Sequence, residues 1–92
     1  MRIKDKDAQI FVKQQRDGMC LVKLSRKMLL KYGDCYGPLD VHHLRTRGSG
    51  GDDVPENMIT LCRKHHTMAG DWIIPREELE ELLHDWFGYD FQ

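Results

Sequence analysis

The residues of this sequence that are best suited to chemistry are two pairs of adjacent histidines. The first pair is His42 and His43 in DVHHL, and the second is His65 and His66 at the end of LCRKHH. Neutral imidazole is a common metal ligand and also a proton acceptor near neutral pH. A hydrolytic metal site needs a few protein ligands, an open position and a nearby base for water. One histidine from each pair at a shared metal, with another as base, would meet these needs.

Three cysteines form a second set of candidate ligands. They stand at positions 20, 35 and 62, and Cys62 lies three residues before His65. An odd number of cysteines, without an apolar signal-peptide core at the N-terminus, argues against a disulfide framework. In a reducing cytoplasm, cysteines near histidines either bind metal or pack as small hydrophobic residues. From composition alone both readings stay open.

Two strands and a short helix are expected to carry the histidines. PLDVHHL (38–44) alternates around the β-branched Val41 and predicts a strand, and NMITLC (57–62) predicts a second one. RKHHTMAG (63–70) predicts a helix. Neighbouring residues of a strand face opposite sides, and neighbouring residues of a helix are about 100° apart. The two members of each pair are therefore expected to have different roles.

The connection between the two strands is long and rich in glycine. It reads RTRGSGGDDVPE (45–56), a composition that allows little regular structure. Loops of this length in compact domains are usually functional or disordered. Arg45 and Arg47 follow the histidine strand and are candidates for binding phosphate. The alternative is that both arginines lie on the surface and stabilise the loop.

Further helices are predicted on both sides of this centre. Residues 6–16 and 21–32 have helical spacing of apolar residues, and a third helix opens at Pro75 and runs to residue 87. The apolar face of the third helix consists of Leu79, Leu82, Leu83 and Trp86. The aromatic residues of this C-terminal part are expected in core or interface packing rather than in base stacking: Trp72, Trp86, Phe87, Tyr89 and Phe91.

The chain of 92 residues is the size of one small domain, and its net charge of -1 is unevenly distributed. Residues 1–31 carry a net charge of +6, whereas residues 71–92 carry -6. The basic part could meet phosphates, or it could be a solvated helix face. The acidic helix at 76–86 could dock a basic partner, or it could be a solvated amphipathic helix. No apolar run is long enough for a membrane span, and a cytoplasmic location is expected.

The sequence LDVHHLRTRGSGGDD–VPENMITLCRKHH resembles the HNH endonuclease family, especially its small phage and prophage members. The motif is carried by His43 on the first strand, Asn57 after the loop and His66 on the helix. RDGMC (16–20) also resembles the stretch that opens such domains, so the resemblance covers about residues 16–70.

This resemblance implies an α+β fold and a division of roles. The fold would be a ββα-metal core, made of a two-stranded antiparallel hairpin and a helix, with flanking N- and C-terminal helices. Residues 1–92 would form a single nuclease domain, with a basic helical arm at 1–34 and an acidic helix at 75–87. His43 corresponds to the general base, and His42 and His66 correspond to ligands of a divalent Mg, Mn, Ni or Zn ion. Asn57 corresponds to the residue that braces the loop and orients the base, although in some branches an asparagine is itself a ligand.

The sequence departs from the family pattern at two places. Many members have another histidine four positions after the helix histidine, where this chain has Gly70; Asp71 or water would have to fill that place. Many members also hold a structural zinc with two CxxC pairs. Here Lys23 replaces the second cysteine of the first pair, and the resemblance suggests a Cys₃His site formed by Cys20, Cys35, Cys62 and His65. The alternative is that Cys20 and Cys62 are buried small hydrophobic residues.

The resemblance implies a metal-dependent DNA endonuclease that leaves 5′-phosphate and 3′-hydroxyl ends, in a bacterial or phage-infected cell. Phage terminase and packaging proteins are the partners that it suggests, and the oligomeric state stays open. One alternative is a zinc-stabilised DNA-binding or adaptor module that does not cut, which the loss of a ligand at Gly70 favours. Another is a nuclease that is active only within a complex.

Overall fold

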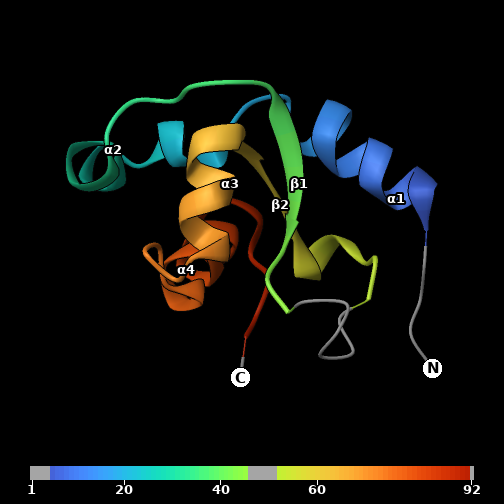
Figure 1. Cartoon of the computed structure of the whole chain (residues 1–92). Helices are drawn as coiled ribbons and strands as arrows, with labels where there is room; N and C mark the ends of the chain where they lie inside the picture. Colours follow the sequence, from blue (N-terminus) through green and yellow to red (C-terminus); the bar gives the residue numbers. More distant parts are fainter. Residues whose placement is uncertain (1–4, 46–51, 92) are drawn as a thin grey trace.

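The centre of the fold is an antiparallel hairpin followed directly by a helix. A computed structural model describes residues 5–45 and 52–91. Strand β1 (Leu39–His43) pairs with β2 (Met58–Cys62), and helix α3 (Arg63–Gly70) begins at the next residue (Figure 1). The predicted α+β fold with a hairpin-and-helix core is therefore confirmed.

The two strands differ in burial, and this difference positions the histidines. All five residues of β2 are buried, as its nearly continuous apolar run suggests, whereas those of β1 are half-buried. In the register, Leu39 lies opposite Cys62 and His43 lies opposite Met58. Helices α1 (Lys6–Ile10) and α3 lie on opposite sides of the hairpin (Figure 1). One face of β1 is therefore turned toward α1 and the other toward α3.

The N-terminal helical segment continues beyond α1 with a wider turn. The predicted helix at 6–16 is α1 followed without a break by η1 (Phe11–Asp17), which has π-helical hydrogen bonding. The segment ends at Gly18, whose φ of 66° lies in the left-handed region that glycine adopts at little cost. The helix predicted at 6–16 therefore has the right extent to within about one residue, and its second part is π-helical.

The predicted helix at 21–32 is divided in two. A 3₁₀ turn, η2 (Leu21–Leu24), precedes α2 (Arg26–Tyr32), and Ser25 between them has extended backbone angles. The Ser25 hydroxyl accepts a hydrogen bond from the backbone N–H of Met28 at 3.2 Å. Serine is a preferred N-cap residue, so Ser25 is the feature of the sequence that indicates the start of a new helix here.

The C-terminal helix α4 (Arg76–Phe87) follows Pro75 as predicted. It buries Leu79, Leu82 and Leu83, and its last residue Phe87 packs against the core together with Tyr89 and Phe91 of the tail. Of the predicted core or interface packing, the core alternative is wrong for the two tryptophans, because Trp72 is 71% exposed and Trp86 is 54% exposed, whereas interface packing stays a prediction. Among residues 5–45 and 52–91, no helix has the length and apolar composition to cross a membrane.

A buried arginine joins the N-terminal segment to the hairpin and the tail. The Arg16 and Asp17 side chains are 5% and 0% exposed and form an ion pair at 2.7 Å. Arg16 also donates to the carbonyls of Pro55 and Met58, and its guanidinium lies over the ring of Phe87 at 4.9 Å. Removing one partner of such a buried pair typically costs about 3–5 kcal/mol. The RDG stretch therefore has a structural role in holding these segments together.

Candidate active site and metal centre

His42 and His66 meet between β1 and α3. Their ring centroids are 5.3 Å apart in an edge-on arrangement. Burial, together with the nearby imidazoles of His66 and His43, lowers the pKa of His42 to about 4. His42 is therefore neutral at physiological pH, which is the form in which imidazole binds metal. The structure thus brings together the two histidines that were predicted as metal ligands.

Asp40 fixes the orientation of His66. Its Oδ2 lies 3.2 Å from His66 Nδ1, and the Arg63 guanidinium binds both oxygens of the same carboxylate. The hydrogen bond from Arg63 holds the pKa of Asp40 below its usual value. Because an ionised carboxylate only accepts hydrogen bonds, the shared proton is on Nδ1 and the lone pair of Nε2 stays available. Asp40 was missed from the sequence, although strand alternation places it on the same side as His42.

His43 faces the opposite side of β1, toward the N-terminal helix. Its Nε2 lies 2.7 Å from Oδ1 of Asp53, and these side chains are 16% and 1% exposed. A groove of about 1000 Å³ runs beside them. It is lined by His43, His66 and Asp40, and by the N-terminal helical residues Lys6 and Lys13 among others. The base candidate and one ligand candidate therefore open onto a common groove.

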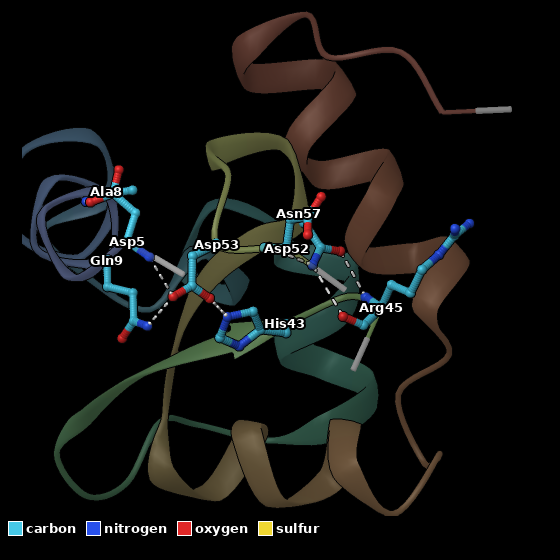
Figure 2. A network of polar contacts seen from close by, with 8 residues as sticks. All are labelled: Asp5, Ala8, Gln9, His43, Arg45, Asp52, Asp53 and Asn57. Carbon is cyan, nitrogen blue, oxygen red and sulfur yellow. Dashed lines mark hydrogen bonds and ion pairs between the residues drawn. The ribbon is translucent and has the colours of Figure 1, made fainter. Parts of the chain in front are cut away.

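Asn57 joins the two ends of the long loop. Its Oδ1 accepts a hydrogen bond from the Arg45 backbone N–H at 2.8 Å. Its Nδ2 donates to the carbonyls of Arg45 and Asp52 at 3.1 and 2.9 Å (Figure 2). Asn57 thus uses both its acceptor and its donors on backbone beside the histidine strand. The Arg45 side chain is exposed, whereas Arg47 lies outside the described residues.

Three cysteines and His65 form a compact cluster at the N-terminal end of α3. The ligand atoms of Cys20, Cys35, Cys62 and His65 all lie within 4.8 Å of one another. The distances from His65 Nδ1 to the three sulfur atoms are 3.5, 3.6 and 3.2 Å. Two donors on a tetrahedral zinc with ordinary bond lengths lie about 3.6 Å apart. The cluster could therefore bind a metal ion such as zinc.

The imidazole of His65 is also oriented for metal binding. His65 is fully buried, and its Nε2 donates to the Gly33 carbonyl at 2.9 Å. This hydrogen bond places the ring proton on Nε2, so the lone pair of Nδ1 points toward the sulfur atoms. A backbone carbonyl in this position is a common outer partner of a metal-binding histidine.

The three thiols differ in how readily they ionise. Burial raises the pKa of Cys20, and raises that of Cys35 to about 12. Burial also opposes the ionisation of Cys62, but hydrogen bonds from the backbone of His65 and Tyr36 bring its pKa below the usual value. Cys62 is therefore the thiol that most readily becomes a thiolate. Coordination to a metal would remove the remaining protons.

Gly70, where the family pattern has a further histidine, has room for a side chain. It lies one turn after His66 at the end of α3, and an added Cβ would meet no described atom within 4 Å. Gly70 also lines a small pocket together with His42 and His43. Asp71, the other candidate for the missing ligand, is exposed, and its role stays a prediction.

We expect Gly70→His to strengthen binding of a divalent ion at His42 and His66. Histidines at i and i+4 of a helix lie on one face, so the new imidazole would reach the same site. The expected gain is about tenfold in affinity, measured by calorimetric titration of the zinc-loaded protein. Gly70→Ala is the matched control, because it adds the same Cβ without a ligand. Equal affinities of the two variants would contradict this placement of the metal.

The comparison with protein families identifies the central segment. Residues 30–71 match the family model described as HNH endonuclease. Searches of curated proteins and of solved structures gave no match. The matched segment contains the hairpin, the loop and α3, with His42, His43, Asn57 and His66 in the arrangement described above. Residues 30–71 of this chain therefore belong to the HNH endonuclease family.

Proposed function

We propose that this protein is a metal-dependent DNA endonuclease. The observation that carries the proposal is the meeting of His42 with His66, at 5.3 Å between ring centroids, beside His43. Two imidazoles side by side suit a divalent ion, and a third imidazole on the next residue of the strand suits a base. The family match supports action on DNA.

Each residue has a distinct part in the proposed hydrolysis. When bound, a divalent ion supplies a Lewis acid at the scissile phosphate and at the leaving oxygen. His42 and His66 would hold it, and Asp40 orients His66 through Nδ1. His43 accepts a proton from the water that attacks phosphorus, as the bond from phosphorus to the 3′ oxygen breaks. The products are a 5′-phosphate and, after the leaving oxygen takes up a proton, a 3′-hydroxyl end.

In this proposal the Cys₃His cluster is a separate, structural zinc site. Its ligands come from the residue before η2, the segment before β1, the end of β2 and helix α3. A zinc bound there would fasten the N-terminal end of α3 to the hairpin and to the segments before η2 and β1. Such sites contribute directly to the free energy of folding. The cluster would thereby fix the distance between β1 and α3 on which the active site depends.

DNA would lie along the groove beside His43 and His66. Lys6 and Lys13 line this groove and are placed to contact phosphates. Arg45, exposed at the end of β1, is a further candidate, as is Arg47 in the undescribed part of the loop. Contacts of these cations with phosphates would carry no sequence information, and they would weaken as the salt concentration rises. Phage packaging proteins, which the resemblance suggests, would be partners that supply specificity.

The proposal is tested by nicking of supercoiled plasmid. We expect the zinc-loaded protein to convert it to open circles with at least one of Mg²⁺, Mn²⁺, Ni²⁺ and Zn²⁺. A chelator that removes the weakly held ion should stop the reaction. DNA ligase should reseal the nicks if their ends are 5′-phosphate and 3′-hydroxyl. Absence of nicking with every ion, alone and with candidate partners, would reject the enzyme reading.

The second candidate function is a zinc-stabilised DNA-binding module that does not cut. The observation that favours it is the glycine at position 70, where many family members have a further histidine ligand. Among the described residues, His42 and His66 are then the two candidate ligands that lie side by side. Such a module would bind DNA in a gel-shift assay and would retain the zinc, but would leave plasmid intact. His43 then would have no catalytic role, and replacing it would not change DNA binding.

A further inference from the structure

The structure assigns to Asp53 the role of positioning His43, with helix α1 as the support that holds Asp53 in place. The catalytic consequence rests on the function proposed above, but the orientation of His43 can be tested without it. Helix α1 lies outside residues 30–71, so the inference adds a part of the chain that the family match does not cover. Asp53 is a positioning residue here, since it acts through His43.

Asp53 lies between His43 and α1, and its carboxylate contacts both. One oxygen, Oδ1, lies 2.7 Å from His43 Nε2. The other, Oδ2, accepts hydrogen bonds from the Asp5 backbone N–H at 3.0 Å and from Gln9 Nε2 at 2.8 Å (Figure 2). The Asp53 side chain is 1% exposed. Such a buried carboxylate requires its hydrogen bonds, so the set of partners is strongly specified.

The contact determines which nitrogen of His43 can take a proton. An acceptor carboxylate requires a donor opposite it, so the proton of the neutral His43 ring is on Nε2. The lone pair of Nδ1 is then free, and the ring cannot turn without losing a buried hydrogen bond. A water proton would pass to Nδ1, and the positive charge that forms would be balanced by Asp53. A carboxylate that holds a catalytic imidazole in one tautomer has this effect in other hydrolases.

Helix α1 holds Asp53 at two points one turn apart. The Asp5 side chain caps the helix by accepting from the Ala8 backbone N–H at 3.1 Å, which fixes the adjacent Asp5 backbone N–H. Gln9 follows one turn later on the same face. Both donors therefore belong to α1 and its N-cap rather than to the loop that carries Asp53. The N-terminal helix is thus connected to His43 through a single side chain.

Replacing Asp53 with asparagine should reverse the tautomer of His43. The amide has one oxygen and one NH₂ group, and the side toward α1 presents two N–H donors. The amide oxygen should therefore turn to α1, and the NH₂ group should face His43 Nε2. That nitrogen would then have to accept, which moves the ring proton to Nδ1 and blocks the proton acceptor.

The first measurement is the tautomer of His43, from long-range ¹H–¹⁵N spectra of the zinc-loaded full chain at about pH 8, where free imidazole is neutral. We expect the proton on Nε2 in the wild type and on Nδ1 in Asp53→Asn. A wild-type proton on Nδ1 would overturn the inference without any variant. Since no DNA is needed, this result is independent of whether the protein proves to be a nuclease.

The second measurement is plasmid nicking by the same proteins. Asp53→Asn should lower kcat on the order of a thousandfold with little change in KM, because Asp53 is buried. Gln9→Ala should lower kcat about tenfold, because it loosens Asp53 without changing its charge. Gln15→Ala, an exposed glutamine of the same segment, should behave as the wild type. Wild-type kcat in Asp53→Asn would overturn the inference, whereas an inactive wild type would reject only the proposed function.

Discussion

Replacing Cys62 with serine is expected to leave the protein largely unfolded at 25 °C. Cys62 is also the N-cap of α3, and serine caps helices well. The variant therefore keeps the helix cap and removes only the metal ligand. What is lost is the thiol whose pKa the backbone amides lower, and with it one of four metal ligands. Structural zinc contributes roughly 10 kcal/mol or more in small domains, against a typical total stability of about 5–15 kcal/mol.

The measurement is a thermal melt by circular dichroism, with elemental analysis of the same samples. The gently purified wild type should contain about one equivalent of zinc, and chelation should lower its melting temperature to that of the variant. Ser25→Cys is a control that adds a thiol to another N-cap without touching the cluster. A Cys62→Ser protein that melts as the wild type does, or a wild type without zinc, would contradict the assignment.

Local patterns were sufficient to predict the elements at the centre of the fold. Alternation around Val41 identified β1, and the RKHH run identified α3 with its correct bounds. The opposite orientations of His42 and His43 also followed, since adjacent strand residues face opposite sides. The structure places His42 against His66 and His43 against Asp53 accordingly. These features depend on spacings of a few residues, which a sequence displays directly.

The contacts that complete the site could not be read from local patterns. Gln9 is 44 residues from Asp53, and the composition of the glycine-rich loop gave no sign that one of its aspartates would be buried. The cysteine cluster also joins distant residues, since Cys20 and His65 are 45 positions apart. It was predicted only through the family resemblance. Tertiary contacts at such separations depend on how the elements pack, not on periodicity.

His43→Ala is expected to lower the rate of DNA cleavage by about a hundredfold to ten-thousandfold. The substitution removes the imidazole that would accept the water proton, and leaves His42 and His66 in place to hold the ion. It also leaves Asp53 without one partner, which typically costs about 1–3 kcal/mol of stability. The rates should therefore be compared at a temperature where a melt shows both proteins folded. His84→Ala, at an exposed histidine of α4, is the matched control.

The most direct test of the central claim is the initial rate at which zinc-loaded wild type and His43→Ala convert supercoiled plasmid to open circles. The two proteins should have equal zinc content and the same divalent ion. We expect rapid nicking by the wild type and by His84→Ala, and at least about a hundredfold slower nicking by His43→Ala. If His43→Ala cuts at the wild-type rate, His43 is not the base and the proposed mechanism is wrong.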